Sequence, residues 1–296
     1  MVYDDIIGYM DESGTRDKFK AIWLSHSSIN DFLKCPRLYF LHNRYKDLRT
    51  SHKISVISPA LTLGQVVHTV IESLSGIPRE ERFADSPIDK FESAWKKVSG
   101  QIGGFENPEQ ENTYKERGLK MIKTIIEKPG PLVNKAIKLK SENGLSSFWF
   151  SEDKNLILCG KVDWIEYLPK TDSIHIIDFK TGRLEEEEES LQLPIYYLLT
   201  KNLQKRKIAK ASYWYLDNGK GLVQKQLPNE ELAIEKINKI ADRISLALKL
   251  DHFKCPSNGC KHCYPYERIL KGEGKWVGIS EYKQDIYILN RPQPEI

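Results

Sequence analysis

Apolar residues are concentrated in two neighbouring segments near the middle of the chain, and their pattern predicts two β-strands. Residues 156–168 are rich in Leu, Ile, Val and aromatic side chains, and residues 174–180 form a short β-branched run. Residues 169–173 have the Pro, Asp and Ser content of a hairpin loop. The pattern therefore predicts a β-hairpin whose second strand ends at Lys180.

A helical period of apolar residues is present in three other segments. In residues 61–76, 191–199 and 230–250, apolar side chains recur every three or four positions. Residues 211–216 and 222–227 have the pattern of a second hairpin. Strands and helices in this mixture predict an α/β fold, with a mixed central β-sheet flanked by helices.

The length of 296 residues fits one domain over residues 1–296. Residues 78–147 contain further helical periods, and we interpret them as a helical insertion in that domain. Seven lysines make the insertion basic: Lys115, Lys120, Lys123, Lys128, Lys135, Lys138 and Lys140. This surface could contact DNA phosphates as one wall of a channel, or it could be an ordinary solvated helix face.

Charge and hydropathy restrict the class of protein. Lys and Arg number 45 and Asp and Glu 41, so the formal net charge of +4 is compatible with nucleic-acid binding without establishing it. No apolar run has the length of a membrane span, and the acidic start at residues 1–5 does not resemble a signal peptide. We expect a soluble cytoplasmic protein with no membrane partner. The sequence leaves protein partners open.

Two carboxylates and an ammonium group are the first candidate site. Asp178 and Lys180 are two apart on a strand and so project from the same face. If the hairpin register brings Asp163 beside them, the trio suits a hard cation such as Mg²⁺. The alternative is a surface ion pair, but a charge after the apolar run of residues 174–177 is costly to bury without a partner.

Polar residues on the two predicted helices are further candidates. Gly64, His68 and Glu72 lie on one stripe, where the glycine leaves the imidazole accessible. Gln192 and Tyr196 are one helical turn apart, so their polar ends point the same way. Taken alone, His68 is more typical of a histidine packed at the edge of a helix than of a ligand, and Gln192 and Tyr196 could equally be the ordinary polar edge of a packed helix.

These motifs together resemble the RecB-type branch of the PD-(D/E)XK nuclease superfamily. G-x-x-x-H at 64–68, G-x-x-D at 160–163, D-x-K-T-G at 178–182 and Q-x-x-x-Y at 192–196 occur in the order of that family, and residues 27–40 are similar to its opening helix. The resemblance implies a restriction-endonuclease-like core. It implies metal binding by His68, Asp163, Asp178 and the Phe179 carbonyl, catalysis by Lys180, and contacts to DNA or to the site from Gln192 and Tyr196.

The five cysteines carry a second signal. Cys255, Cys260 and Cys263 fall within nine residues, a spacing that in a chain without a secretory signal favours a metal centre. Four thiolates suit either Zn²⁺ or an iron–sulfur cluster, and spacing does not choose between them. Cys159, inside a predicted strand, is interpreted as a small buried residue. His262 is an alternative zinc ligand.

The resemblance favours a [4Fe–4S] cluster, because several relatives place one cysteine before the nuclease motifs and three after them. Cys35 and the trio at residues 255–263 match this layout. One departure is that the third trailing cysteine precedes the Cys260–Cys263 pair, as Cys255, while the position where the family has it holds Ile269. A zinc ion, or loss of the cluster, remains open.

The resemblance implies a deoxyribonuclease that uses Mg²⁺ or Mn²⁺. The resemblance further implies an exonuclease on single-stranded DNA or DNA ends, in repair and recombination, phage replication or CRISPR adaptation. The sequence shows no motif that reads base edges, as sequence-specific cutting would need. The alternatives are a non-catalytic DNA-binding scaffold with the same fold and an interaction domain stabilised by a bound zinc ion. The five glutamates at residues 185–189 are expected to form a solvated loop.

Overall fold

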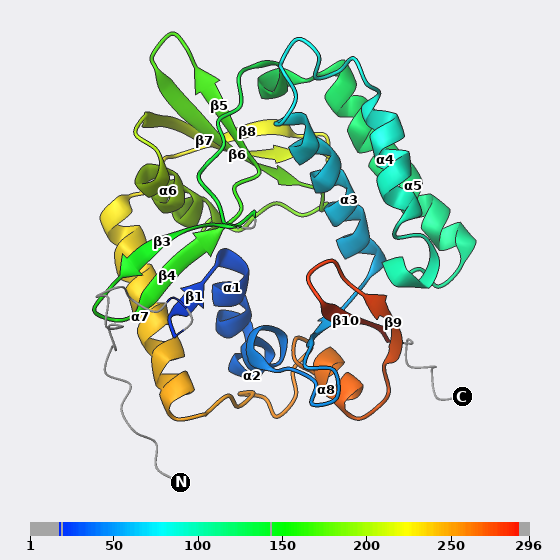
Figure 1. Cartoon of the computed structure of the whole chain (residues 1–296), viewed down its shortest axis with the longest axis vertical. Coiled ribbons are helices and arrows are strands. Elements are labelled where there is room, and N and C mark those ends of the chain that lie inside the picture. Colours follow the sequence, from blue (N-terminus) through cyan, green and yellow to red (C-terminus); the bar gives the residue numbers. More distant parts are fainter. Residues whose placement is uncertain (1–17, 19, 143, 290–296) are drawn as a thin grey trace.

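The computed structural model describes residues 18, 20–142 and 144–289, and in this part of the chain helices surround three short β-sheets (Figure 1). The predicted α/β class is confirmed. The acidic start at residues 1–5 lies outside the described residues. None of the described helices is both long enough and apolar enough to cross a membrane.

A four-stranded mixed sheet carries the motif residues. Its strands, in spatial order, are β5 (Trp164–Leu168), β6 (Ser173–Lys180), β7 (Lys207–Tyr215) and β8 (Gly221–Lys225). The β5–β6 and β7–β8 pairs are antiparallel, as the two predicted hairpins require. The β6–β7 pair is parallel, and such a pair needs a crossover, which α6 (Gln192–Leu203) supplies.

Helices cover both faces of this sheet. On one face, α6 and α7 (Glu230–Lys249) pack against Ile174 and Ile176 of β6. On the other face, α3 (Pro59–Leu74), α4 (Pro87–Lys96) and α5 (Pro108–Glu127) pack against Ile177 and Phe179. Because strand side chains alternate, Asp178 and Lys180 share the face of Ile174 and Ile176 and point toward α6.

The predicted helical insertion at residues 78–147 contains α4, α5 and two short 3₁₀ turns, η2 (Gly100–Gly103) and η3 (Gly130–Val133). Phe91 and Trp95 of α4 are buried together with Met121, Ile122 and Ile125 of α5. The helices therefore contribute to the core under the sheet. The limits of the insertion and the single-domain assignment stay predictions.

The predicted single strand over residues 156–168 is wrong, because the chain changes sheets inside it. β4 (Leu156–Gly160) lies between β1 (Ile22–Leu24) and β3 (Ser146–Ser151) in a separate sheet, and β5 begins at Trp164. The physical reason is that Asp163 leaves the ladder, and its carboxylate accepts a hydrogen bond from the Phe179 N–H. The break places Asp163 between two sheets.

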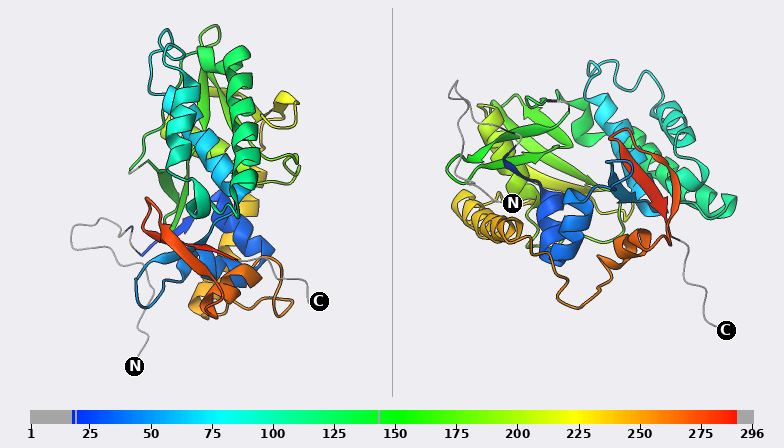
Figure 2. Two further views of the ribbon diagram at one scale, coloured as in Figure 1. Left: turned by 90° about the vertical axis from the view of Figure 1, so that its right-hand side faces the viewer. Right: turned by 60° about the horizontal axis from the view of Figure 1, so that its bottom comes forward.

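The N-terminal and C-terminal parts of the described chain come together in the third sheet (Figure 2). β10 (Gln284–Ile288) pairs in parallel with β2 (Lys53–Val56) and antiparallel with β9 (Lys275–Ile279). Beside this sheet lie α8 (Tyr264–Leu270) and the helical turns that follow α1. The first helix is α1 (His26–Lys34), and the turns that follow it are α2 (Pro36–Tyr39) and the π-helical turn η1 (Phe40–Arg44). The sequence offered no prediction for residues after 266.

Candidate active site and cysteine cluster

The end of β6 and the first turn of α6 form a hydrogen-bonded group around Asp178. Lys180 Nζ lies 3.1 Å from Asp178 Oδ2. Gln192, the first residue of α6, donates from Nε2 to Asp178 Oδ1 across 2.7 Å and accepts a hydrogen bond from Lys180 through its side-chain oxygen. Tyr196, one turn later, places its hydroxyl 3.4 Å from Gln192 Nε2. The structure thus brings four of the predicted site residues together.

Asp178 is an ionisable group in a buried position. Its exposed fraction is 1%, and burial, followed by the neighbouring Asp163 carboxylate, raises the pKa of Asp178 to about 8. Among the described residues Asp178 Oδ2 has the Lys180 ammonium as an ion-pair partner but accepts no hydrogen bond. Buried carboxylates are normally fully hydrogen-bonded, so an unused oxygen beside a second carboxylate suits a cation.

Asp163 and His68 form the second half of the group. Asp163 Oδ2 lies 3.3 Å from His68 Nδ1 and accepts the Phe179 N–H at 2.9 Å. Burial opposes a charge on His68, but the Asp163 carboxylate outweighs it and raises the pKa of His68 to about 9. Close packing of α3 on the motif allows this approach, since a Cβ at Gly64 would lie 3.1 Å from Thr181 Oγ1.

The donor set of this region fits a divalent cation. The candidate ligand atoms of His68, Glu72 and Asp163 all lie within 4.8 Å of one another, and Asp178 lies next to this trio rather than within it. The carboxylate oxygens suit Mg²⁺ or Mn²⁺, whereas an imidazole nitrogen is more typical of transition-metal ions. Glu72 was placed on the His68 stripe by its sequence spacing, but its approach to Asp163 is apparent only in the structure.

Glu186 corrects the interpretation of the glutamate run. Its carboxylate lies 2.7 Å from Lys180 Nζ and is half-buried, whereas the other four glutamates are exposed. The Glu186 N–H donates to the Tyr215 hydroxyl at 3.1 Å, and this bond holds the loop against the sheet. Burial opposes its charge, but Lys180 lowers the pKa of Glu186. Nothing in five consecutive glutamates distinguishes this one.

Two other titratable groups border Lys180. His26, the first residue of α1, is near Glu186 and Lys180, and burial first, then the Lys180 and Lys34 charges, lowers the pKa of His26 to about 4. Tyr196 is buried, and burial raises its pKa well above its ordinary value. At neutral pH both side chains are therefore uncharged. His26 was not singled out in the sequence, although it directly precedes the opening motif.

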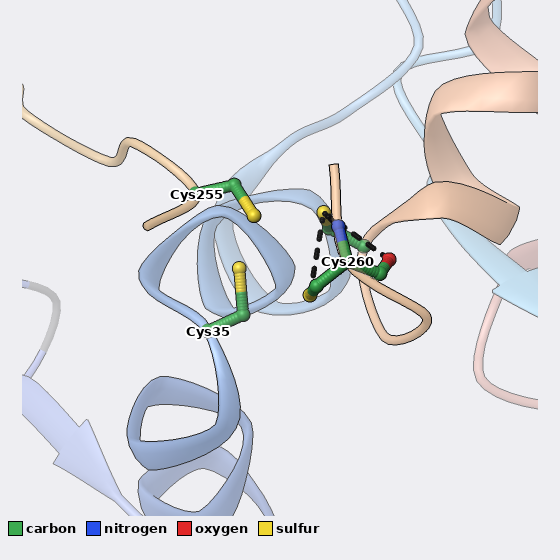
Figure 3. Close-up of side chains that lie close together, drawn as sticks. Cys35, Cys255 and Cys260 are labelled. Atoms are coloured by element: carbon green, nitrogen blue, oxygen red, sulfur yellow. Dashed lines mark hydrogen bonds between the residues drawn. The ribbon is translucent and has the colours of Figure 1, made fainter. Parts of the chain in front are cut away.

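The four predicted cysteines converge at a second place, about Cys35. Cys35 lies between α1 and α2 and faces Cys255 and Cys260 across the interface with the C-terminal segment (Figure 3). The sulfur atoms of Cys35, Cys255, Cys260 and Cys263 all lie within 4.8 Å of one another. Neither Cys159, which is buried in β4, nor His262 belongs to the group. The site joins the two ends of the described chain.

The local backbone of this loop is arranged for thiolate sulfur. The Gly259 N–H donates to Cys255 Sγ at 3.3 Å, and the Cys260 N–H donates to Cys263 Sγ at 3.4 Å. Burial raises the pKa of Cys255, but the N–H groups of Ser257 and Gly259 outweigh it and lower that pKa to about 6. The pKa of Cys260 is lowered too, whereas burial raises the pKa of Cys35 and that of Cys263. The closeness of the four sulfurs fits a tetrahedral metal or an iron–sulfur cluster, which would bind them as thiolates.

Comparison with known proteins gives a family match and similar solved structures. The model of the PD-(D/E)XK nuclease superfamily matches residues 23–269, which include both sites. A crystal structure from Eubacterium rectale described as "Putative exonuclease" is similar with a TM-score of 0.46 and 13% sequence identity, covering 81% of this chain and 86% of that one. A search of curated proteins gave no match.

Proposed function

The chain belongs to the PD-(D/E)XK nuclease superfamily, and on this premise we propose that it is a metal-dependent deoxyribonuclease acting on single-stranded DNA or DNA ends. One observation carries the proposal: Asp163, Asp178 and Lys180 converge with His68 at the end of β6. A retired site has no physical need to keep two carboxylates side by side with one of them fully buried.

The residues that would hold the cation are His68, Asp163 and Asp178, with the Phe179 carbonyl as a further oxygen ligand. Glu72 is close enough to His68 and Asp163 to complete the set. When bound, Mg²⁺ or Mn²⁺ acidifies water and offsets negative charge on the phosphate. The Phe179 N–H also donates a hydrogen bond to Asp163 Oδ2 and so positions that carboxylate.

Lys180 supplies the fixed positive charge. Burial lowers its basicity, but Asp178 and Glu186 more than compensate and raise the pKa of Lys180, so it stays an ammonium group. In this position it orients the attacking water or stabilises charge that develops on the phosphate. Gln192 sets the position of both Asp178 and Lys180, and Tyr196 supports Gln192.

The four-cysteine group is proposed to hold a [4Fe–4S] cluster that joins α1 and α2 to the C-terminal segment. The proximity of the four sulfurs supports a metal centre, and the one-plus-three order along the chain supports iron–sulfur over zinc. Its role is structural, because the cysteines lie in a core cluster distinct from the one under Asp178. Metal analysis of purified protein distinguishes iron with sulfide from zinc.

The function is tested by cleavage of end-labelled single-stranded and duplex DNA with Mg²⁺, Mn²⁺ or chelator. We expect metal-dependent cutting that disappears in Lys180→Ala and Asp178→Ala. Lys210→Ala is the matched control, since Lys210 is an exposed lysine on the neighbouring strand β7. A folded, metal-replete wild type that binds DNA without cutting it would instead establish the non-catalytic scaffold.

A further inference from the structure

A groove opens directly from the carboxylates of the candidate metal site. It has a volume of about 260 Å³, and Glu72 and Asp163 are among the residues that line it. Its walls are residues 136–139, which precede β3, and residues 161–165, which lead into β5. Three serine hydroxyls, those of Ser75, Ser141 and Ser146, also line it.

The groove is lined by charges of both signs. Apart from Glu72 and Asp163, the charged residues that line it are Lys138 and Lys161. Lys138 is exposed, and its ammonium group lies near Gly76, just past the end of α3. A phosphodiester strand in this groove would meet these two lysines next to the carboxylates of the candidate metal site.

Lys161 forms a solvent-exposed ion pair with Glu72. Its ammonium group donates to Glu72, and the Lys161 side chain is 54% exposed while that of Glu72 is 20% exposed. An ion pair with so much solvent contact contributes little stability. Lys161 is therefore free to transfer to a phosphate once a divalent cation neutralises Glu72.

We propose that this groove binds the substrate nucleotide next to the cleaved phosphodiester, with its phosphate on Lys161 and Lys138, and that it accepts a single unpaired strand. The inference rests on the proposed nuclease function and names its substrate class. The volume is slightly below the roughly 300–1,000 Å³ of pockets that hold drug-sized ligands. The groove has room for about one nucleotide, as the single-strand proposal requires.

Binding of a fluorescein-labelled single-stranded oligonucleotide tests the groove. The measurement uses the Asp178→Asn protein with Mg²⁺, in which cutting is removed, and follows fluorescence anisotropy over a range of salt. Lys138→Gln and Lys161→Gln are each expected to weaken binding roughly tenfold. Each should also reduce the slope of log affinity against log salt by about 0.7, the value for one phosphate contact on a single strand.

Lys201→Gln is the matched control. Lys201 is 49% exposed and pairs with Glu230, as Lys161 pairs with Glu72, but it lies on α6 outside the groove. Unchanged affinity and slope in both groove variants would overturn the proposal, and so would an equal loss on a closed circular duplex. Because the assay measures binding, it tests the groove even if the wild-type protein does not cut DNA. A wild type that does not cut would count against the nuclease function, whereas unchanged binding in the variants would count against the groove.

Discussion

The side-chain amide of Gln192 donates to Asp178 Oδ1 across 2.7 Å and thereby ties the first turn of α6 to the end of β6. The same side chain accepts from Lys180, so one residue positions both the buried carboxylate and the ammonium group. Its two ends match its two partners, a donor for the carboxylate and an acceptor for the ammonium group. Neither Asn, which is shorter, nor Glu, which lacks the donor, can replace it.

Gln192→Ala is expected to lower the rate of DNA cleavage roughly 10- to 100-fold, the usual effect of losing a residue that orients metal ligands. The fold should survive, with a loss of about 1–3 kcal/mol from the partners left unpaired. Cleavage rates as a function of Mg²⁺ concentration, together with urea unfolding, check both statements. Gln204→Ala, at the other end of α6, should leave the rate unchanged, and equal rates in the two variants would contradict the role of Gln192.

Asp178 predicts an unusual dependence of stability on pH in the metal-free protein. Its pKa is about 8 in the folded state against an ordinary 3.8, so the folded state retains a proton that the unfolded state releases. This carboxyl group therefore costs stability progressively as pH rises from about 4 to about 8. With chelator present, the unfolding free energy of Asp178→Asn minus that of the wild type should increase by at least about 2 kcal/mol from pH 5 to pH 8.

The check is urea unfolding of both proteins at the two pH values. Mg²⁺ should reduce the difference at pH 8, because a cation stabilises the ionised carboxylate in the wild type only. A stability difference that does not vary with pH would show that Asp178 is already ionised in the metal-free protein.

Local periodicity explains which parts of the site were predictable. The two-residue spacing of Asp178 and Lys180 on a strand and the four-residue spacing of Gln192 and Tyr196 on a helix fix which way these side chains point. The structure places all four as those spacings require. The β5–β6 hairpin follows in the same way from the turn composition between two apolar runs.

Contacts between distant segments explain what was missed. The parallel pairing of β2 with β10 joins residues near 53 and 284, and no local pattern encodes it. The break between β4 and β5 depends on a bond from the Phe179 N–H to Asp163. The approach of Cys35 to Cys255, Cys260 and Cys263 came from the family resemblance, since the spacing of the trailing three does not identify a fourth.

Glu186 predicts a change in the pH profile of cleavage. It contributes, after Asp178, to the raised pKa of Lys180, against the opposing effect of burial. Glu186→Gln removes that charge, so Lys180 should lose its proton at a lower pH and the decline of activity at high pH should shift to lower pH. Glu188→Gln, in the exposed part of the same run, is the control. Identical profiles for wild type and Glu186→Gln would exclude Lys180 as a required cation.

Cys260→Ser tests the proposed cluster through metal content and stability together. Cys260 Sγ lies 3.7 Å from Cys263 Sγ, and a hydroxyl in its place removes one of four thiolate ligands. We expect iron and sulfide content to fall and thermal unfolding to occur at lower temperature, because the centre joins α1 and α2 to the C-terminal segment.

Cys159→Ser provides the comparison, since Cys159 is buried in β4 away from the four-cysteine group. It should lose some stability from the buried hydroxyl but keep its full metal content. Loss of zinc in place of iron would assign the site to Zn²⁺. A Cys260→Ser protein with unchanged metal content and unchanged unfolding temperature would mean that the four cysteines hold no metal. The two ends of the described chain would then be joined by the β2–β10 pairing, the packing of α8 and ion pairs such as Arg37–Glu267.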